Sequence, residues 1–134
     1  MRWRRAAFVL AVAAVAFATV TLVALEGREV VRLRTVTPDG GVHSTRTWVA
    51  DSDGAIWIEA ANGERPFLLD LQAHPEVELV RGGAVLPLRA VPVPGAAAHR
   101  KIRSLLAEKY GWADRWIGLL ADTSHSVAVR LEPR

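Results

Sequence analysis

The chain contains no cysteine, and only one methionine and one tyrosine occur among its 134 residues. The absence of cysteine excludes disulfide bonds, thiol chemistry and lipidation at cysteine. Zinc-protease, CxxC, Walker and GxGxxG motifs are also absent, and no serine lies in a nucleophile-elbow pattern. The four histidines do not have the spacing of metal ligands. The sequence therefore supports neither a metal site nor hydrolytic catalysis.

Charge is missing from residues 6–25, a run of twenty residues that follows a basic head, residues 1–5, with three arginines. At 1.5 Å per residue, a helix of this length matches the roughly 30 Å hydrocarbon core of a bilayer. We therefore predict one transmembrane anchor, followed by a single small domain over residues 26–134. A cleaved signal peptide is the alternative, although its apolar segment is usually shorter and the small-residue cleavage patterns here lie inside the run.

The distribution of charge bears on orientation and on partners. Positive charge before a first apolar segment tends to stay cytoplasmic, which predicts a cytoplasmic N-terminus and a domain outside. Arg28, Arg32 and Arg34 follow the run and reduce this asymmetry. Without the three N-terminal arginines, the domain has 14 basic and 14 acidic residues. This balance gives no sign of the basic patch of a nucleic-acid-binding protein, so we expect no nucleic-acid partner.

Alternating patterns and turn signals predict the elements of the domain. The first three strands are expected to form a meander, with a tight hairpin at Asp53 and Gly54. Pro87 and Pro92 predict an edge strand or a bulge, because proline has no amide donor. Antiparallel strands interrupted by a few helices indicate an α+β domain or small barrel. The predicted strands are residues 31–35, 44–50, 55–60, 77–80, 84–93 and 126–132, and the predicted helices are residues 66–74, 95–110 and 112–120.

Two clusters carry residues suited to ligand binding. In the second strand, Thr45, Arg46 and Thr47 offer hydroxyls and a guanidinium to phosphate oxygens, beside the planar surface of Trp48. An ordinary exposed strand face explains the same pattern. In residues 109–116, three aromatic and two basic side chains are suited to enclose an aromatic ligand. Capping of the domain's core explains this second cluster equally well.

The most specific stretch is residues 66–79, PFLLDLQAHPEVEL. It resembles the helix followed by an N/H-P-x-V-x-V motif in the deazaflavin-dependent nitroreductase branch of the FMN-binding split-barrel superfamily, the pyridoxamine-phosphate-oxidase-like proteins. The likeness extends over roughly residues 29–133. Further family-like positions are residues 33–35, Gly40 and Gly41, Thr45, Asp53 and Gly54, residues 109–115 and residues 130–133.

The resemblance implies an α+β fold, a six-stranded antiparallel split β-barrel with two to three short helices, here preceded by one N-terminal transmembrane helix. It also implies a homodimer that holds FMN or a deazaflavin near its interface. The cofactor carries the hydride in this family, and the protein orients it, so no catalytic side chain is assigned. By position, the residues implied to bind the cofactor are Thr45, Arg46, Thr47, Ala61 and Asn62. Those implied to face the ring or the substrate are Trp48, Tyr110, Trp112, Arg115 and Trp116.

Two departures from the family pattern lead to two hypotheses. Arg46 and Thr47 stand where the branch usually has Thr-Pro, and an acidic turn, residues 37–41, replaces a basic one. The first hypothesis is a membrane-anchored oxidoreductase, similar to nitroreductases or quinone reductases, that transfers hydride to a small or lipid-soluble substrate. The second is a non-catalytic ligand-binding or interaction module that retains the split barrel.

Overall fold

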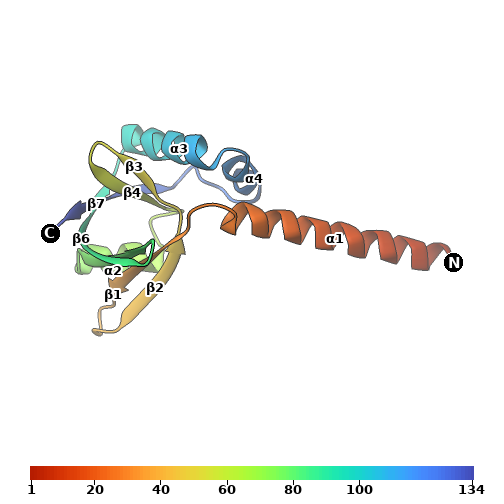
Figure 1. Cartoon of the computed structure of the whole chain (residues 1–134), viewed down its shortest axis with the longest axis horizontal. Helices are drawn as coiled ribbons and strands as arrows, with labels where there is room; N and C mark the ends of the chain where they lie inside the picture. Colours follow the sequence, from red (N-terminus) through yellow and green to blue (C-terminus); the bar gives the residue numbers. More distant parts are fainter.

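The computed structural model describes residues 1–134, and its first element is a long helix that projects from a small domain (Figure 1). Helix α1 (Arg2–Glu26) is long and apolar enough to cross a membrane, although a signal sequence has the same properties. The hydroxyls of Thr19 and Thr21 donate to the carbonyls of Val15 and Phe17 one turn earlier, both over 2.8 Å. These polar groups therefore need no partner outside the helix, as a lipid environment requires.

The domain contains seven strands and three helices, and most lie where the sequence predicts them. The helix that the sequence predicts from Pro66 begins at that residue, which suits the first helical position. The strands are β1 (Val31–Val36), β2 (Val42–Thr47), β3 (Ala50–Ser52), β4 (Ala55–Ala60), β5 (Glu76–Arg81), β6 (Ala84–Val93) and β7 (Val127–Pro133). The helices are α2 (Pro66–Ala73), α3 (Ala96–Tyr110) and α4 (Trp112–Leu120).

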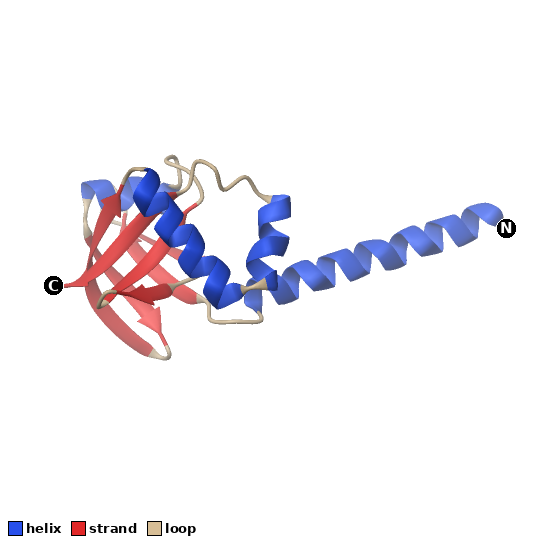
Figure 2. Cartoon of the chain, turned by 90° about the horizontal axis from the view of Figure 1, so that it is seen from above, coloured by secondary structure: helices blue, strands red, loops and turns tan.

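The strands form one curled antiparallel sheet in the order β2-β1-β5-β6-β7-β4-β3, with helices packed around it (Figure 2). The prediction of six strands was wrong by one, because the expected strand over residues 44–50 breaks at Trp48 and Val49. β2 pairs with β1, whereas β3 pairs with β4 at the other end of the strand order. The predicted three-strand meander is therefore interrupted, and the chain crosses the split of the barrel between β2 and β3.

Two details of turns and pairing test the sequence expectations. The hairpin between β3 and β4 has Asp53 at φ 54° and Gly54 at φ 72°, which confirms the tight turn. The expectation of an edge strand at the prolines was wrong, because β6 lies between β5 and β7. β6 pairs with β5 over residues 84–89 and with β7 over residues 88–93, so Pro87 and Pro92 each lie where one side has no neighbouring strand. A missing amide donor is tolerated there.

Two hydrophobic cores lie on opposite sides of the sheet. One includes Ile58 of β4 and the apolar side chains of α2, and the other packs under α3 around Trp57 and Ile102. Ala24 of α1 belongs to the second core and is only 1% exposed. The end of the long helix is therefore part of the domain's packing rather than a free tether.

The buried carboxylate of Asp70 joins three elements. It accepts a hydrogen bond of 2.9 Å from the Thr35 hydroxyl of β1, and its oxygen lies 2.6 Å from the His43 Nδ1 atom of β2. We expect Asp70→Ala to lower the free energy of unfolding by about 2 kcal/mol, because the Thr35 hydroxyl would stay buried without a partner. Denaturant titration in detergent measures this. Leu69→Ala, at an exposed neighbour on the same helix, is the control, and equal losses in both variants would refute the bridging role.

Candidate functional site

Arg46 lies on the outer face of β2, opposite Arg32 of β1 in the strand register. Thr45 and Thr47 pair with Leu33 and Val31, whose side chains are buried, so both threonines lie on the inner face. Side chains alternate between the faces of a strand. Of the three residues predicted to bind the cofactor, Arg46 therefore lies on the outer face of β2, and Thr45 and Thr47 lie on the inner face.

The two arginines lie beside a polar hollow of about 310 Å³. Like charges directly opposite each other on a sheet are unfavourable, and a bound anion would relieve this repulsion. Arg46 pairs with the carboxylate of Glu26 at the end of α1, whereas Arg32 has no carboxylate partner. Arg32 is not among the site residues predicted from the sequence, although its place in the alternation of β1 marks it as outward-facing. The hollow is lined by Val30, Val31, Arg32, Arg46, Val80, Gly82 and Gly83.

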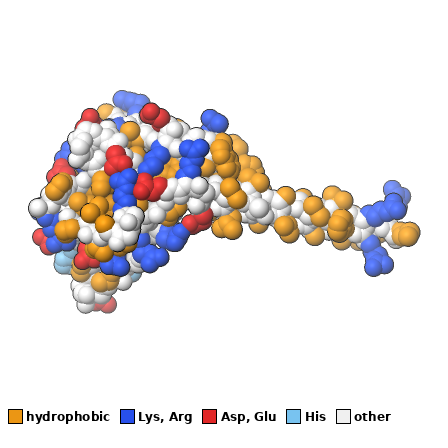
Figure 3. Space-filling view, in the orientation of Figure 1, with side chains coloured by type: hydrophobic (Ala, Val, Ile, Leu, Met, Phe, Trp, Pro, Cys, Tyr) orange, Lys and Arg blue, Asp and Glu red, His pale blue; other side chains and the backbone are white.

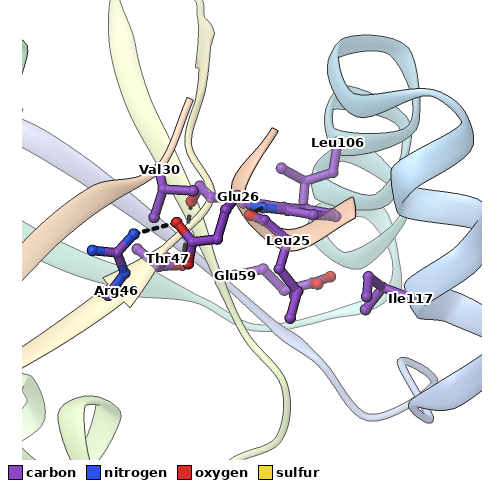
Figure 4. Close-up of a pocket in the computed structure, with 9 residues that line it drawn as sticks. Leu25, Glu26, Val30, Arg46, Thr47, Glu59, Leu106 and Ile117 are labelled. Carbon is purple, nitrogen blue, oxygen red and sulfur yellow. Dashed lines mark hydrogen bonds and ion pairs between the residues drawn. The ribbon is translucent and has the colours of Figure 1, made fainter. Parts of the chain in front are cut away.

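Arg46 also lines a second hollow, which is more apolar and has a volume of about 230 Å³. Figure 4 shows Leu25, Leu106 and Ile117 around it and Arg46 reaching toward Glu26. Arg46 thus lines both hollows and joins an anion-attracting surface to an apolar one. The second hollow is lined by Leu25, Glu26, Val30, Arg46, Thr47, Trp48, Glu59, Leu106 and Ile117.

Trp48 and Tyr110 are stacked, with ring centroids 4.2 Å apart and planes 7° apart. The Tyr110 hydroxyl donates to the Glu29 carbonyl at 2.6 Å and accepts from the Val49 amide at 3.1 Å. Tyr110 is 0% exposed, and burial raises the pKa of its hydroxyl. Tyr110, which the family resemblance placed near a ligand ring, therefore fills the core and hydrogen-bonds the backbone in this structure. Trp48 keeps an exposed part at the apolar hollow.

The other aromatic and polar residues predicted for the site lie apart from both hollows. The Trp116 ring packs 5.6 Å from Phe17 of α1, and its indole N–H donates to the Thr21 hydroxyl at 3.0 Å. Trp112 and Arg115 are exposed on α4. Ala61 and Asn62 follow β4, where the Asn62 side chain accepts from the Glu64 amide at 2.9 Å and stabilises its own turn. The structure brings together Arg46, Thr47 and Trp48, and not Ala61, Asn62, Trp112, Arg115 or Trp116.

Two ionic networks that could not be predicted from the sequence lie beside the site. Arg81 of β5 binds the carboxylates of Glu29 and Asp51, and these hydrogen bonds hold both pKa values below their ordinary range. Lys109 also binds Glu29, at 2.6 Å. Their partners lie dozens of residues apart in sequence, so no local pattern could reveal these pairs.

The second network lies behind the apolar hollow. Arg103 of α3 binds Glu59 at 2.9 Å and Asp114 at 2.7 Å, and the Ser126 hydroxyl donates to Glu59 at 2.8 Å. Glu59 is the one acid of the hollow besides Glu26, and its charge is already matched by Arg103. The chain holds no convergent set of three His, Asp or Glu side chains for a metal ion.

No protein-family model matches the sequence, and a search of curated proteins also gives no match. Solved structures match over most of the chain. A putative pyridoxamine 5'-phosphate oxidase from Listeria innocua shares 16% identity over 84% of this chain and 90% of its own, with a TM-score of 0.60. An F420-H2 dependent reductase, FDR-A, shares 20% identity over 77% of this chain and 94% of its own, with a TM-score of 0.57. A protein described as a domain-swapped dimer shares 20% identity over 78% and 81%, with a TM-score of 0.60.

These likenesses confirm the resemblance that the sequence shows. The chain has the split-barrel fold of the pyridoxamine-phosphate-oxidase-like proteins and of the F420-dependent reductases. At these identities, the likeness establishes the fold, and the chemistry has to be argued from the chain's own residues.

The place of Tyr110 in the core yields a testable prediction. Tyr110→Phe removes the hydroxyl that bonds the Val49 amide and the Glu29 carbonyl, so we expect a loss of about 1–3 kcal/mol in the free energy of unfolding. Denaturant titration in detergent measures the loss. Trp112→Phe, at an exposed aromatic two residues away, is expected to change stability by under about 0.5 kcal/mol. An unchanged free energy of unfolding in Tyr110→Phe would contradict the structural role of the hydroxyl.

The Arg81 network predicts how stability depends on pH. Because the folded-state pKa values of Glu29 and Asp51 are lowered, their contribution is present above the ordinary carboxyl pKa and is lost as pH falls through the lowered values. We expect Arg81→Met to be less stable than the parent chain at neutral pH, with the difference shrinking below about pH 4. Denaturation midpoints across this range measure the difference.

Arg65→Met is the control, since the Arg65 side chain is exposed in the turn before α2. Only its backbone takes part in the structure, where its carbonyl accepts hydrogen bonds from the amides of Leu68 and Leu69. A stability difference for Arg81→Met that stays constant from neutral to acid pH would show that the two carboxylates do not draw their stabilisation from Arg81.

Proposed function

We propose that this protein is a membrane-anchored oxidoreductase that uses FMN or a deazaflavin and transfers hydride to a small or lipid-soluble substrate. The observation that carries the proposal is the position of Arg46, between an anion-attracting hollow and an apolar one, on a split-barrel fold. A phosphorylated ring compound has these same two parts. When bound, the cofactor supplies the hydride chemistry, and the chain's residues bind and orient it.

The donor set fits the phosphate end of such a cofactor. Arg32 and Arg46 present two guanidinium groups from neighbouring strands, and guanidinium forms strong, paired hydrogen bonds to phosphate. In this proposal Thr47 and Trp48, at the apolar hollow, contact the uncharged part of the ligand. Thr45, Ala61 and Asn62 take no part, because they do not line either hollow.

Contacts between α1 and the domain support an uncleaved anchor rather than a signal peptide. Ala24 is buried in the core, and the indole N–H groups of Trp48 and Trp116 donate to the Leu25 carbonyl and the Thr21 hydroxyl of α1. Removal of α1 would leave both donors and an apolar surface without partners. In the proposed orientation, the basic N-terminal head is cytoplasmic and the domain lies outside.

The edge of the sheet supports a homodimer. β2 is the first strand of the sheet order, pairs only with β1, and has mostly exposed side chains. An exposed edge strand of six residues is a ready surface for pairing with another chain. The polar hollow adjoins this strand, so a second copy would lie close to the proposed phosphate site.

A second candidate function is a ligand-binding module without catalysis. It is favoured by the pairing of Glu26 with Arg46, which places a carboxylate where a phosphate would bind, and by the separation of Asn62 from the site. An absorbance spectrum of the protein purified with its anchor, followed by titration with FMN and with a deazaflavin, distinguishes the two. A bound cofactor that can be reduced would support the oxidoreductase. If neither cofactor binds, the oxidoreductase proposal is refuted.

The paired arginines predict the binding energetics. We expect Arg32→Ala and Arg46→Ala each to weaken cofactor binding about tenfold or more, because each removes a charge-assisted contact worth about 1.5–3 kcal/mol. Glu26→Gln is expected to strengthen binding, since it releases Arg46 from its carboxylate partner. Fluorescence or absorbance titration measures all three. Arg65→Ala is the matched control, and unchanged affinity in the Arg46 variant would place the cofactor elsewhere.

A further inference from the structure

Helix α4 carries an apolar surface that no part of the chain covers. Leu119 is 82% exposed, Leu120 49% and Trp112 42%, on a helix of only nine residues. Asp114, on the opposite face of the helix, is buried, and so is Ala113. Three large apolar side chains exposed together on so short a helix mark an interaction surface.

This surface is continuous with the apolar surface of α1. Trp116 of α4 packs on Phe17 and hydrogen-bonds Thr21, so α4 lies beside the last turns of the long helix. Phe17 precedes Leu25, the last residue of the uncharged run, by eight positions, which is about 12 Å along a helix. Figure 3 shows hydrophobic side chains where the domain meets the long helix, with acidic and basic side chains beside them.

The charges of α4 suit a lipid surface. Its one acid, Asp114, turns inward to bind Arg103, whereas its one cation, Arg115, is exposed. A long basic side chain can reach the headgroups while its stem contacts apolar surface, and Trp is favoured at the membrane–water boundary. The helix thus exposes apolar groups and one cation, and hides its anion.

We infer that α4 inserts into the domain-side leaflet of the bilayer, with Trp112, Leu119 and Leu120 at the boundary between headgroups and acyl chains. The inference rests on the proposed anchor, because α1 fixes the depth of α4. The apolar hollow then lies at the membrane surface, since Leu25 of α1 and Ile117 of α4 both line it. A lipid-soluble substrate would reach this hollow directly from the bilayer.

The cysteine-free chain allows a direct test with three single-cysteine variants. Leu119→Cys reports on α4, Leu10→Cys on the N-terminal half of α1, and Leu69→Cys on an exposed apolar position of α2 away from the membrane face. Each carries an environment-sensitive fluorophore in the full chain, reconstituted into phosphatidylcholine vesicles with or without nitroxide-labelled lipid. All three positions are exposed, so labelling is not expected to disturb folding.

We expect nitroxide lipid to quench the fluorophores at Leu119 and Leu10 by about twofold or more, and that at Leu69 hardly at all. Quenching at Leu10 without quenching at Leu119 would overturn the insertion of α4 and leave the anchor intact. Absence of quenching at Leu10 would overturn both. An apolar emission spectrum at Leu119 that nitroxide lipid does not change would indicate a protein partner and also refute the inference. Cofactor titration in detergent tests the oxidoreductase separately.

Discussion

The structure depends on one hydrogen-bonded junction, where the chain crosses the split of the barrel at Val49. A strand that leaves one edge of a sheet and joins the other loses its ladder partners at the crossing, and buried backbone groups without partners are costly. Here the Tyr110 hydroxyl accepts from the Val49 amide, and Lys109 Nζ donates to the Val49 carbonyl at 2.7 Å. The C-terminal turn of α3 therefore supplies the hydrogen-bond partners that the sheet cannot give to Val49. These bonds make the break between β2 and β3 favourable.

The same junction sets the direction of the long helix. Trp48 stacks on Tyr110 and donates through its indole nitrogen to the Leu25 carbonyl at 3.1 Å. Arg28 donates to the Lys109 carbonyl at 2.5 Å. Residues that close the barrel thus also hold the end of α1. The connection between α1 and the domain is therefore rigid rather than flexible. This explains why Ala24, within the uncharged run, is one of the most buried residues of the chain.

Local signals in the sequence predicted local structure well. Gly54 and Pro66 fix a turn and a helix start through their own backbone preferences, so the neighbouring elements could be placed from sequence. The break at Val49 could not, because residues 44–50 have strand propensity throughout and only the distant Tyr110 makes an interruption favourable. Pro87 and Pro92 led to a wrong prediction of an edge strand for a related reason. The staggering of β5 and β7 leaves one side of a central strand without a neighbour at each proline.

The same contrast between local signals and distant contacts applies to the residues of the candidate site. Arg46 and Trp48 were recognisable by residue type, and Arg32 was recognisable by its position in an alternating strand once its partner strand was known. The packing role of Trp116 could not be recognised from the sequence, because its ring is covered by α1, and its partner Thr21 lies 95 residues earlier. Aromatic residues in the tail of the domain fit either a ligand or a packing partner, and in this chain the transmembrane-length helix provides the packing partner.

The arrangement links attachment to binding. Glu26, the last residue of α1, pairs with Arg46, and Leu25 lines the apolar hollow beside it. Any tilt of α1 relative to the domain would therefore change both the pairing of Glu26 with Arg46 and the width of the hollow. An anionic ligand at Arg46 would compete with Glu26 for the same guanidinium, so binding of such a ligand would be coupled to the position of α1. A soluble domain without α1 would lack this coupling, and it would also lack part of the wall of its own site.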